Sequence, residues 1–224
     1  MELIKELPAV FEDFAEARRN AFVNVKKVKD QGIPVIGSYC TYFPQELAIA
    51  AGAATVGLCS TSGETIAAAE KDLPANLCPL IKSSYGFAKE DKCPFFYFSD
   101  IVVGENTCDG KKKMYELMSD FKDVFIMDLP NSQSDKGLEL YKEELLRMKD
   151  YVEKKFEVTI TDEDMRKAVK LENEIRVAKK NLVDTMKNDP CPVSGLDMFH
   201  VLYGSGFKFD HTAIVPEIEA VQAK

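Results

Sequence analysis

Four short apolar runs, each separated from the next by a helix-like segment, restrict this 224-residue chain to few folds. The expected strands are residues 33–37, 54–58, 95–98 continuing through 101–103, and 124–127. Strands that alternate with helices pair in parallel through right-handed crossovers. The pattern therefore predicts an α/β fold: a four-stranded parallel open sheet flanked by helices, followed by a helical hairpin.

Helical signals fill most of the remaining chain. Six segments show apolar residues at three- and four-residue steps or the terminal residues typical of helices: 9–31, 44–51, 65–70, 111–121, 135–156 and 161–187. The last two are long and have no strand between them, so they form the expected hairpin. We expect Asn76 to cap a further helix and Ser194 or Asp197 to begin the last one. The sequence thus divides into an α/β domain, residues 1–133, which bears most of the cysteines, and a helical region, residues 134–224.

Composition excludes several classes of protein. The formal net charge is −8 and the isoelectric point is near 5.0, whereas a protein that binds nucleic acid regardless of its sequence needs a basic face. No stretch is apolar over the ~18 residues that suggest a membrane span, and the N-terminus lacks the apolar core of a signal peptide. We therefore expect a cytoplasmic protein that binds neither nucleic acid nor membrane.

The six cysteines carry the clearest chemical signal: Cys40, Cys59, Cys78, Cys93, Cys108 and Cys191. A reducing cytoplasm disfavours disulfides, which leaves inert buried thiols, a redox site or a metal site. Cys40 follows the first expected strand and Cys108 the third, so both lie at the edge where open α/β sheets bind ligands. Cys78 lies at an expected helix N-terminus, which favours the thiolate. An iron–sulfur cluster held by these three thiolates is the first candidate, and zinc with one further ligand is the alternative.

Three segments around these cysteines also carry a family resemblance. They are CTYFPQELAIAAGA (residues 40–53), NLCPLIKSSYG (residues 76–86) and TCDGKKKM (residues 107–114). Together they resemble the 2-hydroxyacyl-CoA dehydratase/benzoyl-CoA reductase family, and within it the N-terminal portion of the double-cubane-cluster proteins. The similarity covers nearly the whole chain.

The resemblance implies a set of residue roles. Cys78 and Cys108 match the two cluster cysteines that the first domain of the family supplies, and Cys40 matches a cysteine typical of the double-cubane branch. The implied cofactor is an iron–sulfur cluster of double-cubane or 4Fe-4S type. Glu46 occupies a carboxylate position that resembles one near the dehydratase active site, which makes it the candidate catalytic acid or base. A carboxylate that interacts only with the helix dipole is the alternative for Glu46.

The resemblance also implies partners. Relatives bind their cluster between two α/β domains and receive electrons from an ATP-hydrolysing iron–sulfur activator protein. We expect no second α/β domain within these 224 residues, which are either a fragment of a longer protein or a half-length relative. In both cases a dimer or a partner chain would have to complete a two-sided site. The implied substrate is a small molecule or an acyl-CoA.

Three functions follow from these observations. The first is the N-terminal part of an ATP-dependent, low-potential iron–sulfur reductase of the double-cubane type, which Cys40 favours. The alternative enzyme is a subunit of an oxygen-sensitive 2-hydroxyacyl-CoA dehydratase. The third hypothesis is a metal-free accessory or scaffold half-protein, which the absent second domain favours.

Overall fold

The computed structural model describes residues 14, 16 and 20–223 of the chain. Its internal contacts form two compact units, residues 28–165 and a second unit that joins the described residues up to 27 with 166–223. The division between residues 133 and 134 suggested by the sequence stays a prediction.

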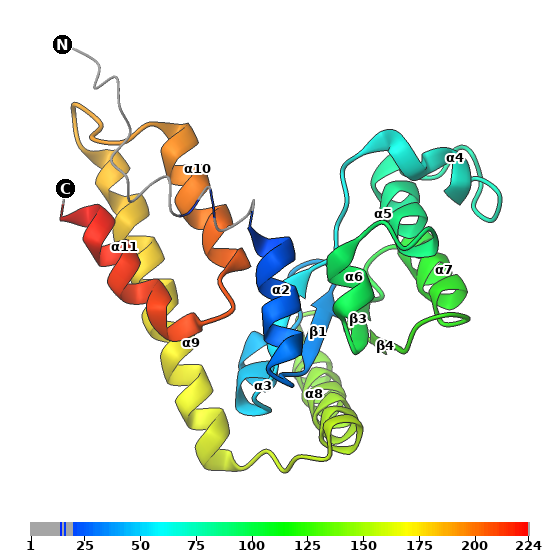
Figure 1. Cartoon of the computed structure of the whole chain (residues 1–224). Helices are drawn as coiled ribbons and strands as arrows, with labels where there is room; N and C mark the ends of the chain where they lie inside the picture. Colours follow the sequence, from blue (N-terminus) through cyan, green and yellow to red (C-terminus); the bar gives the residue numbers. More distant parts are fainter. Residues whose placement is uncertain (1–13, 15, 17–19, 224) are drawn as a thin grey trace. The chain divides into compact units, whose positions relative to one another are not determined.

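A four-stranded parallel sheet forms the centre of the first unit (Figure 1). Its strands are β1 (Val35–Ser38), β2 (Ala54–Gly57), β3 (Ile101–Glu105) and β4 (Val124–Met127), in the order β2-β1-β3-β4. All three neighbouring pairs are parallel. The predicted fold class is thereby confirmed, because each crossover between strands contains helix.

The helices of this unit connect the strands and follow the last one. They are α3 (Gln45–Ala50), α4 (Ile66–Ala69), α5 (Pro79–Lys89), α6 (Pro94–Phe98), α7 (Asp109–Met118) and α8 (Asp135–Phe156), with a 3₁₀ turn η1 (Gly63–Thr65) before α4. Ser134 caps α8 by accepting a hydrogen bond from the Gly137 N–H. The helix predicted at residues 135–156 is confirmed at both ends.

The run at residues 95–98 was predicted as the start of a strand, and this prediction is wrong. It forms helix α6 instead, with Pro94 in its first turn and Cys93 as the N-cap. The Cys93 thiol accepts a hydrogen bond from the Phe96 N–H at 3.4 Å, and a first-turn proline loses no hydrogen bond that a helix would supply. An uninterrupted apolar run does not distinguish a buried strand from a buried helix. The strand begins at Ile101 and continues past Gly104, the expected end, to Glu105.

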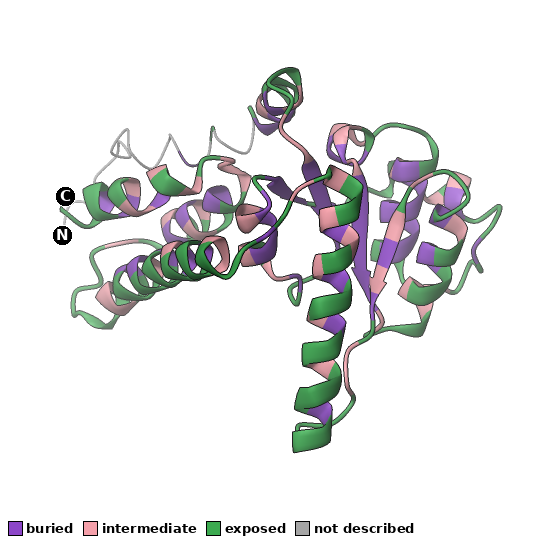
Figure 2. Cartoon of the chain, turned by 90° about the horizontal axis from the view of Figure 1, so that it is seen from below, coloured by how far each residue is buried: buried purple, intermediate pink, exposed green. Residues whose placement is uncertain are grey.

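One face of the sheet packs against α3 and α8. Ile36, Ile101 and Met127 project from three strands into one apolar cluster with Met148 and Val152 of α8, and all five are at most 1% exposed. Figure 2 shows that the strands are mostly buried, whereas the helices have buried residues on one side. Burial of both sheet faces explains why the strands read as continuous apolar runs rather than alternating ones.

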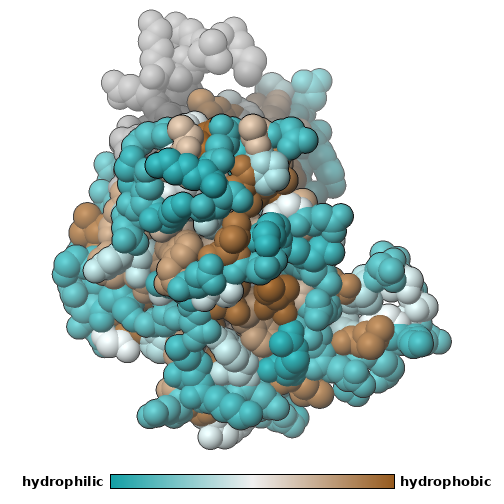
Figure 3. Space-filling model, turned by 90° about the vertical axis from the view of Figure 1, so that its right-hand side faces the viewer, coloured by the Kyte–Doolittle hydropathy of each residue, from teal (hydrophilic) through white to brown (hydrophobic). Residues whose placement is uncertain are grey.

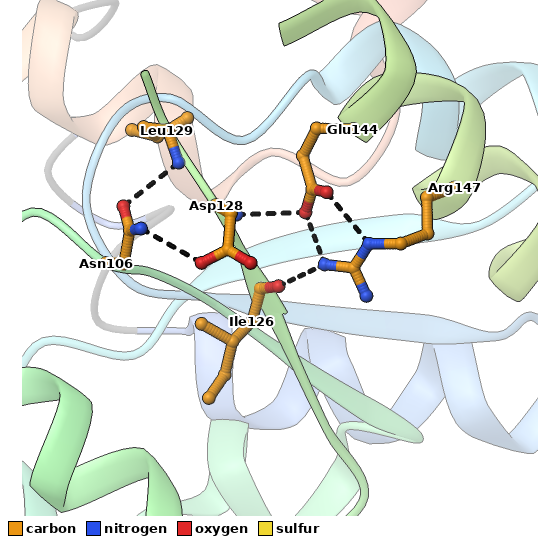
Figure 4. Close-up of polar contacts among 6 residues, drawn as sticks. All are labelled: Asn106, Ile126, Asp128, Leu129, Glu144 and Arg147. Atoms are coloured by element: carbon orange, nitrogen blue, oxygen red, sulfur yellow. Dashed lines mark hydrogen bonds and ion pairs between the residues drawn. The ribbon is translucent and has the colours of Figure 1, made fainter. Parts of the chain in front are cut away.

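A polar network attaches α8 to the end of β4 (Figure 4). The buried Glu144 carboxylate accepts the Asp128 N–H at 2.9 Å and the Arg147 Nε at 2.8 Å. Arg147 also donates to the Ile126 carbonyl at 2.6 Å, and Asn106 donates to the Asp128 carboxylate at 2.9 Å. The loop after β4 is thus held to α8 and to the loop after β3, next to the carboxyl edge of the sheet.

The second unit is helical. It contains α9 (Asp162–Asp184) from residue 166 onward, η2 (Thr185–Lys187), α10 (Gly195–Gly204), η3 (Ser205–Phe207), η4 (His211–Ala213) and α11 (Ile214–Gln222). Phe14, Ile175, Val201 and Ile218 are among the residues of its apolar core. The predicted helix at 161–187 and the cap at Ser194 are confirmed. Helix α2 (Ala21–Asp30) confirms the C-terminal half of the helix predicted at 9–31, whose N-terminal part lies mostly outside the described residues.

The surface is mostly hydrophilic with apolar side chains among the polar ones, as Figure 3 shows for one side. The large exposed apolar residues include Leu80 of α5, Tyr97 of α6 and Phe121 after α7. Within the described part of the chain, every helix is too short or too polar to cross a bilayer.

A hydrogen bond between a histidine and a buried carboxyl group in the helical unit predicts acid sensitivity. His211 Nδ1 lies 2.7 Å from Glu172 Oε1, and Glu172 is 7% exposed. Burial raises the pKa of Glu172, but its hydrogen bond to His211 and the charges of Arg176 and Lys179 outweigh burial, so the pKa is lowered overall. A carboxyl whose pKa is lower in the folded state contributes stability above its unfolded pKa of about 4.3, and this contribution is lost as the pH falls through the folded value.

We therefore expect Glu172→Gln to reduce the free energy of unfolding by about 1–2 kcal/mol at pH 6, with a smaller difference at pH 3. Urea unfolding across this pH range measures both quantities. The control is Glu174→Gln on the same helix, because Glu174 is half exposed and 3.7 Å from Lys170. Equal pH dependence in the two variants would contradict the assignment.

Candidate functional site

The carboxyl edge of the sheet brings together loops that follow three strands. Cys40 follows β1, Cys59 follows β2, and Cys108 follows β3. Ligands of open α/β sheets bind at this edge. The pairing of Ser38 with Gly57 aligns the ends of β1 and β2, so Cys40 and Cys59 each lie two residues beyond an aligned pair.

Cys40 has an unusual backbone and a charged neighbour. Its φ angle is +67°, in the left-handed region that residues other than glycine seldom adopt. The Lys111 Nζ lies 2.7 Å from the Cys40 Sγ and 3.5 Å from the Glu105 Oε1. Burial lowers the pKa of Lys111, but the contacts with Cys40 and Glu105 outweigh burial and raise it overall. Lys111 is therefore a fixed cation beside the Cys40 thiol.

Glu105 links the loops of this edge. It is the last residue of β3 and is 3% exposed. Its Oε2 accepts the Tyr42 N–H at 3.2 Å, and its Oε1 accepts the Thr107 hydroxyl at 3.3 Å in addition to the Lys111 contact. A buried charge is tolerated only with such partners. Glu105 thus ties the loop after β1 to the loop after β3 and to α7.

From the sequence, no role was assigned to Glu105 or to Lys111. Lys112 and Lys113 pair with Asp109 and Glu116 at the surface. The Lys111 side chain, in contrast, is only 12% exposed. A carboxylate that ends a buried strand, six residues before a lysine, was the available signal.

Cys59 is the second thiol of this region. The backbone N–H and the thiol of Cys40 both interact with the Cys59 thiol. Burial raises the pKa of the Cys59 thiol, while the Cys40 N–H and the charge of Lys111 act in the opposite direction. From the sequence, no role was assigned to Cys59, because a single cysteine after a strand has no distinctive pattern.

Cys78 and Cys108 occupy equivalent positions on two adjacent helices. Cys78 is the N-cap of α5 and Cys108 is the N-cap of α7, and both are exposed. Asn76, the predicted cap, lies two residues earlier. The helix starts are tightly packed, since a Cβ at Gly110 would come within 2.8 Å of Leu77. Both thiols are thus exposed beside helix N-termini, whose N–H groups and dipoles favour anions.

Glu46 lies in the first turn of α3 and is partly buried. Burial, followed by the charges of Glu46 and Glu105, raises the pKa of Tyr141 on α8. The two carboxylates therefore lie in electrostatic range of the same phenol. The structure places Glu46 near the Glu105 loops, while its catalytic role stays a prediction.

The thiols do not form a preassembled site for a single metal ion. Among the described residues, no group of three or more His, Cys, Asp or Glu side chains is arranged to hold one. The zinc alternative, which needs one further ligand, stays a prediction. The donor chemistry of exposed thiols next to backbone N–H groups is what an iron–sulfur cluster requires, so Cys40, Cys78 and Cys108 stay the predicted ligands. Cys93 and Cys191 instead interact locally, with the Phe96 N–H and the Val193 carbonyl.

Comparison with known proteins gives the family. Residues 40–224 match the 2-hydroxyglutaryl-CoA dehydratase D-component family. The chain is 52% identical over its full length to YjiM of Escherichia coli (strain K12), which is named as a dehydratase subunit. It is 24% identical over 96% of its length to the (R)-phenyllactyl-CoA dehydratase beta subunit of Clostridium sporogenes. It spans 59% of the length of each of these relatives. The chain belongs to the 2-hydroxyglutaryl-CoA dehydratase D-component family.

Proposed function

We propose that this chain acts as a subunit, or part of a subunit, of a 2-hydroxyacyl-CoA dehydratase. The observation that carries the proposal is the family match over residues 40–224, a range that begins at Cys40 and includes Cys78 and Cys108. Both relatives described above are named as dehydratase subunits. The sequence-based preference for a double-cubane reductase has Cys40 as its main support, and the relatives' names favour the dehydratase alternative instead.

The proposed site assigns a task to each group. Cys78 and Cys108 bind the iron–sulfur cluster, which when bound supplies a redox-active centre for the substrate thioester. Glu46 holds or releases a proton at its carboxylate. Glu105 fixes the position of Lys111, and Lys111 holds a positive charge beside Cys40 at the same edge.

The proposed assembly has more than one component. The Clostridium sporogenes relative is named as a beta subunit, which supports a partner subunit for this chain as well. An acyl-CoA substrate and an ATP-hydrolysing iron–sulfur activator complete the proposal. The partner subunit, or a second copy of the chain, would supply the remaining cluster ligands.

We expect the anaerobically reconstituted chain to bind iron and acid-labile sulfide and to show a sulfide-to-iron charge-transfer band. Cys78→Ser and Cys108→Ser should each lose at least about half of the bound iron, because a cluster needs every thiolate of its set. Cys191→Ser is the matched control, since Cys191 is exposed but lies in the helical unit. Equal iron content in all four proteins would contradict the site and favour the metal-free scaffold.

Two further measurements separate the enzyme hypotheses. Conversion of a 2-hydroxyacyl-CoA to the enoyl-CoA, by the chain with its partner subunit, activator and ATP, would support the dehydratase. A cluster spectrum that Cys40→Ser leaves unchanged would support it too. A spectrum altered by Cys40→Ser, without dehydration of any acyl-CoA, would favour the double-cubane reductase.

A further inference from the structure

The ends of β1 and β2 bring two cysteines into neighbouring positions. The ladder between these strands continues past Ser38 and Gly57, because the Leu58 N–H donates to the Ser38 carbonyl at 2.9 Å. Cys40 and Cys59 lie two residues beyond the last strand pair, and Cys40 leaves the strand with a φ of +67°. Neighbouring strands lie about 4.8 Å apart, so the two loops leave the sheet at a separation close to the Cα distance of about 4.4–6.8 Å that a disulfide needs.

The two cysteines also interact with each other. The thiol and the backbone N–H of Cys40 both hydrogen-bond the Cys59 thiol. The next residue, Ser60, donates its backbone N–H to the Ser84 hydroxyl at 3.1 Å. This hydrogen bond anchors the loop that contains Cys59 to α5. Both cysteines are unpaired and exposed, which makes them accessible to a small oxidant.

We propose that Cys40 and Cys59 form a hydroperoxide-sensitive thiol pair that closes into a disulfide at the carboxyl edge of the sheet. This modification site shares Cys40 with the predicted cluster ligands, and the proposal does not rest on the proposed function. A Cys40 sulfur bound in the disulfide can no longer act as a thiolate beside Lys111 or bind a metal.

The reaction balances with a hydroperoxide as the oxidant. The Cys40 sulfur attacks the terminal peroxide oxygen; the O–O bond breaks, an S–O bond forms, and an alcohol leaves with the proton of Cys40, or water when the oxidant is hydrogen peroxide. The Cys59 sulfur then attacks the Cys40 sulfur; the S–O bond breaks, the S–S bond forms, and water leaves with the proton of Cys59. Two thiols lose two electrons and the peroxide gains them.

The test uses the full, reduced, metal-free chain and one equivalent of hydrogen peroxide, followed by alkylation of the remaining thiols and peptide mapping. We expect a linked peptide pair containing Cys40 and Cys59, reversed by dithiothreitol. We also expect loss of the Cys40 thiol to be about tenfold faster than loss of the Cys191 thiol, because the Lys111 ammonium 2.7 Å from the Cys40 sulfur stabilises the negative charge on the leaving oxygen, whereas Cys191 contacts the Val193 carbonyl.

Two serine variants provide the controls. In Cys59→Ser, Cys40 should stop at the sulfenic acid, which dimedone traps, and in Cys93→Ser the disulfide should form as in the unchanged chain. Oxidation of Cys40 at the same rate as Cys191, or a Cys40 disulfide mainly with another cysteine, would overturn the proposal. Either result leaves the iron-binding test of the proposed function unaffected.

Discussion

Glu105→Ala is expected to destabilise the sheet-containing unit by about 3–4 kcal/mol. The substitution removes the acceptor of the Tyr42 N–H and of the Thr107 hydroxyl, and it removes the carboxylate that neighbours the nearly buried Lys111 ammonium. A buried ion that loses its partner costs far more than a surface ion pair contributes. The loops after β1 and β3 would lose their shared anchor.

Urea unfolding of the whole chain measures the loss of stability. Hydrogen exchange of the β1 and β3 amides shows whether the loss occurs in the sheet-containing unit. Glu116→Ala is the matched control, because Glu116 lies on the adjacent helix α7 and pairs with Lys113 at the surface. Apart from the effect of alanine on helix propensity, Glu116→Ala should lower the free energy of unfolding by less than about 0.5 kcal/mol. Comparable losses in the two variants would show that Glu105 does not organise this edge.

Gly104→Ala should destabilise the same unit by about 2–3 kcal/mol although it adds one methyl group. A Cβ at Gly104 would lie 2.3 Å from the Cζ atom of Tyr115 and 2.6 Å from two further ring atoms. The Tyr115 ring is fully buried, and the Tyr39 ring packs at 5.7 Å between centroids. A buried ring packed against another ring resists the displacement that the added methyl group would require.

Gly57→Ala provides the comparison for this prediction. Gly57 is the last residue of β2, and no atom lies within 4 Å of a Cβ placed there. We expect its free energy of unfolding to change by no more than about 0.5 kcal/mol. The double variant Gly104→Ala/Tyr115→Leu should lose less free energy of unfolding than the sum of the losses in the two single variants, since the smaller side chain relieves the clash. Additive costs would argue against the contact as the cause.

The sequence predicted the strands and long helices well where the signal is local. The helix at 135–156 has its cap residue Ser134 immediately before it and a left-handed residue, Glu157, after it. Strand 124–127 is likewise bounded by turn residues and was placed correctly. Residues 95–98 were misassigned because four consecutive apolar residues fit either structure, and only the packing around Cys93 and Pro94 selects the helix.

The candidate site was predictable only in part. Strand and helix ends predicted that Cys40 and Cys108 lie at the carboxyl edge and that Cys78 lies at a helix N-terminus. The neighbours of these thiols were not predictable, since Lys111 is 71 residues from Cys40 in the sequence. Burial of Glu105 and the approach of Cys59 likewise depend on strand register.

By itself, the sequence determined the α/β class, the parallel sheet and the positions of the cysteines on their elements, because apolar periodicity and capping act over a few residues. Tertiary structure alone decided that Glu105 is buried, that Lys111 lies beside Cys40, and that Cys40 and Cys59 are neighbours. These contacts join residues that only the lateral order of the strands brings together, and no local pattern encodes that order.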